Sequence, residues 1–382
     1  MTETIAKIEN LVLKFYTYEG IVHALDEVNL EIKKGETLGV VGETGCGKSV
    51  TGLSILSVVV PPGKIEGGHV LLQTDGGTID VLQQRPAYLR KIRGRKIAMI
   101  FQEPRAALNP VYTVNDQISE AILLHRKTEM CERVLQQIDE EVKRCSQLKR
   151  PFLKIEKKIY EKMLKNPDSL LVDTLASIPI IGRFKNRLKK EARKEVIKLL
   201  KDMRIPDPER VADMYPHELS GGMAQRVVIA IALSCTPELL IADEPTTNLD
   251  VTVQAQILEL LNELKSKYNT TLIYITHDMG VIAEVCDRVA VMYAGNVVEL
   301  AEVYEIFKDP LHPYTKALLQ SIPRPGHKFI SIEGSVPSLI NPPKGCRFHP
   351  RCAYAREVCT LVKPQFLEAK PGHFVQCNLY GG

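Results

Sequence analysis

The sequence predicts an α/β fold with a mostly parallel β-sheet at its centre, and three observations support this prediction. Continuous apolar runs of strand length recur along the chain. The run at residues 37–42 is followed by glycines and then by a helical pattern, which is the order strand, loop, helix. Later runs follow segments with helical periodicity. Repeated crossovers of this kind are typical of a buried parallel sheet whose strands are connected by helices.

The expected elements follow from these runs in order. Residues 5–15 and 27–32 are predicted to be two early strands, joined by a turn-forming sequence near Gly20. The remaining strands are predicted from the apolar runs at residues 37–42, 96–101, 238–243, 271–276 and 288–293. Residues 224–234 and 251–267 have the spacing of helices between these strands.

The composition excludes several classes of protein. With 45% hydrophobic and 25% charged residues, the 382-residue chain is neither globally disordered nor a collagen-like repeat. A net charge of only +4 does not favour nucleic acid as a partner. The longest apolar stretch, near residues 53–60, is too short to span a membrane. The first residues lack a secretory signal pattern, so we expect a cytoplasmic protein whose nine cysteines do not form disulfides.

Residues 42–49, which we call the phosphate loop, match the pattern G-x-x-x-x-G-K-[ST]. They are Gly42, Glu43, Thr44, Gly45, Cys46, Gly47, Lys48 and Ser49. Glycines at these positions let backbone N–H groups converge on phosphate oxygens at the N-terminal end of the following helix. Lys48 is expected to reach the β- and γ-phosphates, and the Ser49 hydroxyl is expected to bind Mg²⁺.

Two carboxylates end a buried strand further along the chain. Asp243 and Glu244 follow the apolar residues 239–242. A carboxylate at the end of such a strand can hold Mg²⁺ through water, which suits Asp243. A second one beside it can accept a proton from an attacking water, which suits Glu244. Beside a phosphate loop, this pair is predicted to be functional.

A second glycine pair opens a predicted helix at Ser220, Gly221 and Gly222, which we call the signature turn. Such a turn is a second candidate anion site. One nucleotide rarely needs two of these sites in a single chain. We therefore expect two chains arranged head to tail, each completing the other's pocket.

Taken together, the motifs resemble those of the ATP-binding-cassette (ABC) ATPases. GETGCGKS, Gln102, LSGGM, LLIADEP, residues 247–250 and His277 occur in the order found in that family, over about residues 5–300. The segments FQEP (101–104), YPHE (215–218) and DPLHPYT (309–315) resemble the ATP-binding subunits of dipeptide/oligopeptide importers. Met223, where most cassettes carry Gln, resembles the D-type subunit of the D/F heterodimer that those importers use.

The resemblance implies the architecture of an ABC cassette. Residues 1–300 are expected to form a P-loop NTPase domain with a RecA-like core, an antiparallel β subdomain and a helical subdomain at about 103–225. The sequence departs from the family pattern at about 126–200, where a basic helical insertion is expected, because residues 142–201 hold 18 Lys and Arg against 6 Asp and Glu and the segment is longer than the family's usual helical subdomain. That insertion could meet anionic lipid headgroups or form a solvated hairpin. Residues 301–382 are expected to form a small Cys-rich C-terminal domain.

The resemblance also implies roles for individual residues. Phe15 would stack on adenine, with Tyr16 as the neighbouring candidate and packing on the strand face as the alternative. Gln102 would touch Mg²⁺ and the attacking water. His277 would contact the γ-phosphate, and Asp250 would lie across the dimer interface. The signature turn would contact the γ-phosphate held by the partner chain.

Four cysteines near the C-terminus, Cys346, Cys352, Cys359 and Cys377, lie in a Pro-rich region. Four thiolates can close a zinc site or hold an iron–sulfur cluster. Similar tails in the dipeptide-importer family carry a [4Fe–4S] cluster, which we favour over zinc and over unliganded buried cysteines.

The predicted function is that of an ATP-hydrolysing importer subunit that couples ATP, with Mg²⁺, to solute uptake. Its expected partners are an F-type ATPase subunit, two transmembrane permease subunits and, indirectly, an extracellular solute-binding protein. It would work at the cytoplasmic face of the membrane. Peptide is the expected cargo, with an oligosaccharide such as a cello-oligosaccharide, or nickel, as alternatives. The rival hypothesis is a soluble ABC ATPase acting on nucleic acid, although no nucleic acid is expected as a partner.

Overall fold

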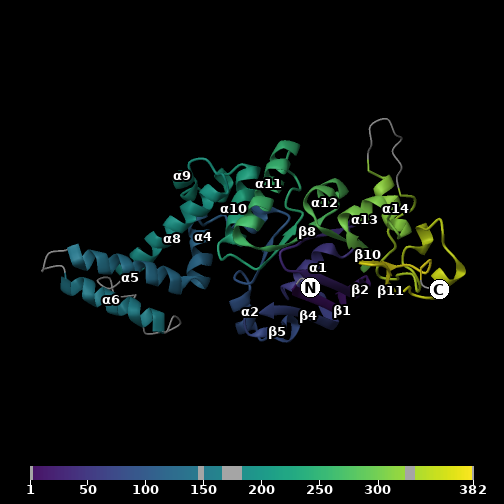
Figure 1. The fold of residues 1–382 in the computed structure, drawn as a ribbon, viewed down its shortest axis with the longest axis horizontal. Helices are drawn as coiled ribbons and strands as arrows, with labels where there is room; N and C mark the ends of the chain where they lie inside the picture. The colour runs from purple at the N-terminus through teal and green to yellow at the C-terminus, as the bar shows by residue number, and fades with distance from the viewer. Residues whose placement is uncertain (1–2, 145–149, 166–182, 323–331, 381–382) are drawn as a thin grey trace. The chain divides into compact units, whose positions relative to one another are not determined.

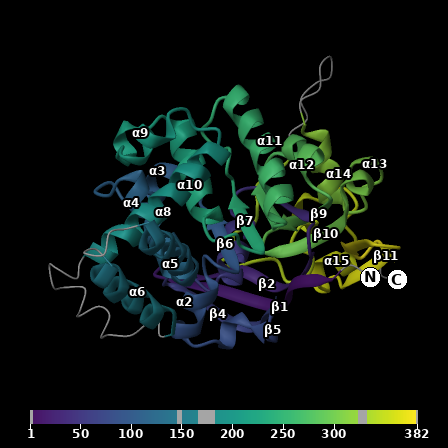
Figure 2. The same ribbon diagram turned by 60° about the vertical axis from the view of Figure 1, so that its left-hand side comes forward.

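The computed structural model describes residues 3–144, 150–165, 183–322 and 332–380. The chain divides into two compact units, which are described separately below (Figures 1 and 2). The first comprises residues 1–102 and 237–382, and the second comprises residues 103–236. Among the described residues, no helix has the length and apolar character needed to cross a bilayer.

The first unit contains two sheets. Its strands are β1 (Thr4–Thr17), β2 (Gly20–Lys33), β3 (Thr37–Val41), β4 (Gly63–Thr74), β5 (Gly77–Asp80), β6 (Ile97–Ile100), β7 (Leu239–Asp243), β8 (Thr271–Thr276), β9 (Arg288–Tyr293), β10 (Asn296–Glu302), β11 (Phe366–Lys370) and β12 (His373–Gln376). Strands β2-β1-β4-β5 form an antiparallel sheet. The larger sheet has the order β11-β12-β10-β9-β3-β8-β7-β6, and its strands from β9 to β6 are parallel. The predicted parallel core is therefore confirmed.

The helices of the first unit are short apart from α11. They are α1 (Lys48–Ile55), α2 (Pro86–Ile92), α11 (Val251–Tyr268), α12 (Met279–Val285), α13 (Val303–Lys308), α14 (Pro313–Gln320) and α15 (Glu357–Leu361), with single 3₁₀ turns η1 (Val81–Gln83) and η3 (His349–Arg351). Every residue of β3, β7 and β8 is buried, which explains why their sequences are continuously apolar rather than alternating.

The C-terminal residues belong to the first unit and extend its larger sheet, and the domain boundary expected at residue 300 stays a prediction. Strand β12 pairs with β10, and β11 pairs with β12. In Figure 1 the helices α13 and α14 lie beside the β10 end of this sheet. A fully buried carboxylate joins β12 to β10. Glu299 on β10 lies 2.7 Å from Nε2 of the buried His373 on β12.

The second unit is helical. It contains α3 (Pro104–Ala107), α4 (Val114–His125), α5 (Lys127–Arg144), α6 (Arg150–Lys165), α8 (Arg183–Asp202), α9 (Pro208–Ala212), the 3₁₀ turn η2 (Pro216–Glu218) and α10 (Gly221–Leu233). The amphipathic helices α5 and α6 lie side by side and each buries an apolar stripe. Most of the insertion expected at 126–200 is thus packed helix in the described residues, and the structure does not test its contact with lipid.

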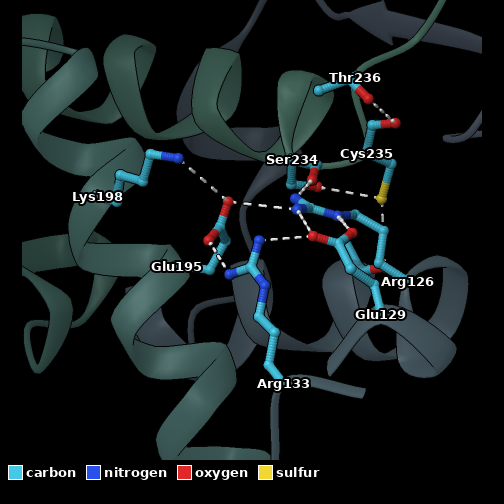
Figure 3. A network of polar contacts seen from close by, with 9 residues as sticks. Arg126, Glu129, Arg133, Glu195, Lys198, Ser234, Cys235 and Thr236 are labelled. Atoms are coloured by element: carbon cyan, nitrogen blue, oxygen red, sulfur yellow. Dashed lines mark hydrogen bonds and ion pairs between the residues drawn. The ribbon is translucent and has the colours of Figure 1, made fainter. Parts of the chain in front are cut away.

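A buried carboxylate connects the insertion to its neighbours in the second unit (Figure 3). Glu195 on α8 accepts hydrogen bonds from Arg126, at 3.3 Å, and from Arg133 on α5, at 2.8 Å. Arg126 also donates to the backbone carbonyl of Ser234, just after α10, at 2.8 Å. Its guanidinium pairs with Glu129 as well. Buried charge pairs of this kind fix the positions of three helices relative to one another.

Candidate nucleotide site

The phosphate loop connects the end of β3 to the start of α1, as predicted. Its shape requires glycine at two positions. A Cβ atom on Gly42 would lie 2.1 Å from the Met292 carbonyl oxygen. Gly47 has φ of +96°, and a Cβ there would lie 2.8 Å from the Ala24 carbonyl oxygen. The glycines therefore allow the loop to pass close to β9 and β2 on its way to the start of α1.

Lys48 is buried and folds back over the phosphate loop. Its ammonium donates to the carbonyl oxygens of Gly42, at 2.7 Å, and Glu43, at 3.1 Å. Burial lowers the pKa of Lys48. A triphosphate in the loop would replace these carbonyl contacts with contacts to phosphate oxygens, so the lysine is held close to the place where its charge is needed.

Ser49 and Asp243 come together although they are far apart in the sequence. The Ser49 hydroxyl donates to Oδ1 of Asp243 at 3.0 Å. Asp243 is buried, and its burial raises the pKa of this carboxyl group. A hydroxyl oxygen and a carboxylate oxygen are hard ligands of the kind that Mg²⁺ prefers, so the donor set fits the predicted ion.

Glu244 is the centre of a second set of contacts. Its carboxylate accepts hydrogen bonds from the Gln102 amide at 3.0 Å and from the Thr247 hydroxyl at 2.9 Å. Nδ1 of His277 lies 3.1 Å from its other oxygen. Burial would raise the pKa of Glu244, but the hydrogen bonds from His277 and Thr247 outweigh burial and hold the pKa below its usual value. The carboxylate is therefore ionised at neutral pH and able to accept a proton.

The backbone of Glu244 is in an unusual conformation. Its φ is +45°, in the left-handed region that non-glycine residues rarely adopt. The Glu244 N–H donates to the Ile275 carbonyl at the end of β8, at 2.9 Å. Strain of this kind costs on the order of 1–3 kcal/mol and persists only where the surroundings hold it. The carboxylate on this backbone contacts both Gln102 and His277.

The structure thus brings together three predicted catalytic residues, Gln102, Glu244 and His277, and, in a separate contact, Ser49 with Asp243. Thr247 is an additional contact that the sequence prediction did not assign, although it lies three residues after Glu244. Asp250 is exposed and caps α11 by accepting from the Val253 N–H at 2.9 Å.

Phe15 lies on β1, partly buried beside Gly63, while the hydroxyl of Tyr16 donates to Glu66 at 3.0 Å. No contact of Phe15 tests its expected role in stacking on adenine. Cys46 is fully buried in the phosphate loop, and burial raises the pKa of its thiol.

The signature turn belongs to the second unit. Ser220 is exposed and caps the thirteen-residue helix α10, accepting a hydrogen bond from the Met223 N–H at 3.3 Å. Gly221 and Gly222 form the first turn of the helix. An exposed helix N-terminus of this kind can receive an anion from another molecule.

The four C-terminal cysteines line one small pocket together with His312, Phe348 and His349, among others. The Cys346 N–H donates to the Cys359 carbonyl at 2.8 Å, which joins two of the four positions directly. Burial raises the pKa of Cys346 to about 11. Among the residues that the structure describes, however, no group of three or more His, Cys, Asp or Glu side chains is arranged to hold a metal ion. The expected [4Fe–4S] cluster is not supported by this arrangement and stays a prediction.

Comparison with known proteins agrees with this geometry. A family profile described as "ABC transporter" matches residues 25–247, which includes the phosphate loop, the signature turn and Glu244. The chain belongs to the ABC transporter family. A second profile, described as "Oligopeptide/dipeptide transporter, C-terminal region", matches residues 298–359 of this ABC protein. The predicted resemblance to dipeptide/oligopeptide importer ATPases is confirmed, and the chain is an ABC ATPase.

Two relatives match this chain over nearly its whole length. The dipeptide transport ATP-binding protein DppD of Bacillus subtilis is 41% identical over 381 residues, which are 99% of this chain and 95% of the relative. The oligopeptide transport ATP-binding protein OppD of Escherichia coli is 37% identical and covers 98% of this chain and 93% of the relative.

Among solved structures, the dimeric cassette MJ0796, in a post-hydrolysis state bound to ADP and Pi, matches with a TM-score of 0.55 and 25% identity. It covers 78% of this chain and 99% of that one. The predicted cassette fold is confirmed by this match.

Proposed function

We propose that this chain is the D-type ATPase subunit of a peptide importer. It would pair head to tail with an F-type ATPase subunit and drive two permease subunits at the cytoplasmic face of the membrane, receiving cargo from a solute-binding protein. Relatives over nearly the whole chain carry names of dipeptide and oligopeptide transport proteins, which favours peptide over an oligosaccharide or nickel. The same relatives argue against the rival nucleic-acid function.

The observation that carries the mechanism is the set of three side chains around the Glu244 carboxylate. In the proposed site, the phosphate loop binds the triphosphate through its N–H groups, and Lys48 contacts the β- and γ-phosphates. Ser49, Gln102 and Asp243 would hold Mg²⁺, and this ion would neutralise part of the negative charge of the phosphates.

Glu244 is then the general base, because it is ionised and its oxygens are held by polar neighbours. It accepts the proton of a water that attacks the γ-phosphate. Gln102 orients that water, and His277 contacts the γ-phosphate. General-base catalysis of this type contributes about 10²–10⁴ in rate.

The signature turn completes the pocket of the partner subunit. Ser220, Gly221 and Gly222 would contact the γ-phosphate bound by the F-type subunit, and Asp250 would lie along the same interface. Phe15 would stack on the adenine. ATP binding would close the two subunits, closure would move the permeases, and hydrolysis would reopen the pair.

The test of this function uses the transporter assembled with its partner ATPase and permeases. Glu244→Gln is isosteric and removes the basic carboxylate, so we expect ATP binding to be retained while turnover falls at least about 10²-fold. Glu284→Gln, at an exposed glutamate on α12, is the matched control and should keep the wild-type rate. A wild-type rate in Glu244→Gln would refute the assignment of the base.

Cargo and partners are tested in the same preparation. We expect the chain to co-purify with an F-type ATPase and two permeases, and ATP-dependent uptake into vesicles to require peptide rather than oligosaccharide or nickel. Salt-sensitive retention on DNA, without permeases, would support the nucleic-acid alternative instead.

We further propose that Cys346, Cys352, Cys359 and Cys377 hold a [4Fe–4S] cluster, with zinc as the alternative. The proposal starts from the place of all four cysteines among the residues that line one pocket, although the described side chains are not arranged as a preformed metal site. Thiolates are the ligands of both groups, and either would hold the C-terminal residues together. Iron and acid-labile sulfide measured in anaerobically purified protein should approach four of each per chain. Stoichiometric zinc without sulfide would support the alternative, and neither metal would refute the site.

A further inference from the structure

The C-terminal residues contact the phosphate loop directly. Arg351, in η3, forms a two-point ion pair with Glu43 of the loop: its two terminal nitrogens lie 2.8 and 3.2 Å from the two carboxylate oxygens. The Arg351 side chain is only 4% exposed. Its guanidinium also lies 5.8 Å from the centre of the Tyr293 ring. Paired, planar contacts of this type fix both distance and orientation.

A second C-terminal residue holds the backbone at the same position. The hydroxyl oxygen of Tyr314, on α14, accepts a hydrogen bond from the Glu43 N–H at 3.0 Å. Tyr314 is fully buried and packs against Tyr293 and Phe348, with ring centres 4.6 and 5.4 Å away. Three aromatic rings in mutual contact have little freedom to move. The side chain and the main chain of Glu43 are thus both held by residues more than 270 positions away.

The ion pair with Arg351 compensates the negative charge that Glu43 places in the phosphate loop. A carboxylate within an anion-binding loop repels a polyphosphate, and the repulsion is strong because the site is partly shielded from water. Arg351 neutralises Glu43 through contacts to its carboxylate oxygens. Tyr314 keeps the Glu43 peptide in a single orientation. Both contacts act on nucleotide through the loop and do not require contact with the nucleotide itself.

We propose that Arg351 and Tyr314 are positioning residues for ATP binding: they hold Glu43 so that the phosphate loop is pre-shaped and free of an uncompensated negative charge. The C-terminal region thereby sets the affinity of the nucleotide site. This inference rests on the proposed role of residues 42–49 in binding triphosphate.

The test measures the dissociation constant of a non-hydrolysable ATP analogue for the purified full chain with Mg²⁺. We expect Arg351→Ala to weaken binding roughly tenfold, because Glu43 is left unpaired near the phosphates. Glu43→Gln introduced into Arg351→Ala removes that charge and should restore binding to within about threefold of wild type. A purely structural defect would not be repaired by this second change. Arg356→Ala, an exposed arginine of the same region, is the control and should bind like wild type.

Two further variants keep the result unambiguous. Tyr314→Phe removes only the hydroxyl acceptor and should weaken binding a few-fold, so it tests the proposal even if Arg351→Ala does not fold. Lys48→Ala tests the loop assignment itself: wild-type affinity there would refute the proposed phosphate loop. The positioning role alone is overturned if Lys48→Ala loses binding while Arg351→Ala and Tyr314→Phe keep wild-type affinity. It is also overturned if adding Glu43→Gln to Arg351→Ala restores no binding of the analogue.

Discussion

Glu299 offers the sharpest test of how the C-terminal residues are attached. It is fully buried on β10 and accepts hydrogen bonds from the N–H groups of Leu311, at 2.6 Å, and His312, at 2.9 Å, and from His373 at 2.7 Å. The other ring nitrogen of His373, Nδ1, has no hydrogen-bond partner among the described residues, so Nε2 carries the side-chain contact that joins β12 to Glu299.

Glu299→Gln removes the negative charge of the carboxylate. It also replaces one carboxylate oxygen, which accepts hydrogen bonds, with an amide NH₂ group that faces the N–H donors around it. Hydrogen bonds to charged groups contribute about 1.5–3 kcal/mol each, and breaking a buried pair on one side costs about 3–5 kcal/mol. We therefore expect a loss of about 3 kcal/mol in the free energy of unfolding. For a domain of 150–250 residues this corresponds to a melting temperature lower by about 6–12 °C.

The chain has no tryptophan, so unfolding is best followed by circular dichroism. Glu302→Gln, at the exposed end of the same strand, is the matched control and should change stability by less than about 0.5 kcal/mol. Limited proteolysis of Glu299→Gln should begin in residues 301–382, since these lose their attachment first. Melting within 1 °C of wild type would show that the buried carboxylate does not hold β12 and α14 in place.

Two further predictions concern stability. Glu195→Gln should destabilise the helical second unit by about 1.5–3 kcal/mol, because Arg126 and the partly exposed Arg133 lose their charge-assisted hydrogen bonds to this buried carboxylate, although both keep Glu129 as a partner (Figure 3); an unchanged denaturant midpoint for loss of helix would contradict this. Burial lowers the pKa of His312 to about 4, against an opposing effect of Glu299, and its Nδ1 accepts from a backbone N–H. The unfolded chain binds this proton below about pH 6.5 and the folded chain only near pH 4, so stability should fall as pH falls through that window, by at most about 1.4 kcal/mol per pH unit. His312→Gln should flatten the dependence of melting temperature on pH between 7 and 5, and an equal slope in both proteins would refute it.

The parallel core could be predicted from the sequence because strands buried on both faces leave continuous apolar runs. The proposed catalytic residues Gln102 and His277 were expected from the resemblance to ABC ATPases, and Glu244 also from its place at the end of a buried strand. Gln102, Glu244 and His277 follow β6, β7 and β8, which are neighbours in the sheet. The carboxyl ends of parallel strands meet at one edge, so side chains in the loops after them converge there.

The C-terminal strands were missed for a physical reason. Strand β12 has only four residues, and it pairs with β10 beside the buried Glu299–His373 contact. The Pro-rich composition of this region favoured a separate loop-like domain. Strand propensity is weak in so short a segment, and tertiary contacts decide its structure.

The contacts of Arg351 and Tyr314 were equally invisible, because they join positions 308 and 271 residues apart. The two contacts act on one residue of the phosphate loop, one on its backbone and one on its side chain. Two attachments to the same loop residue are what the proposed control of the loop by the C-terminal region requires. In that proposal the C-terminal region is part of the nucleotide site in the energetic sense, even though the motifs that bind nucleotide all lie outside it.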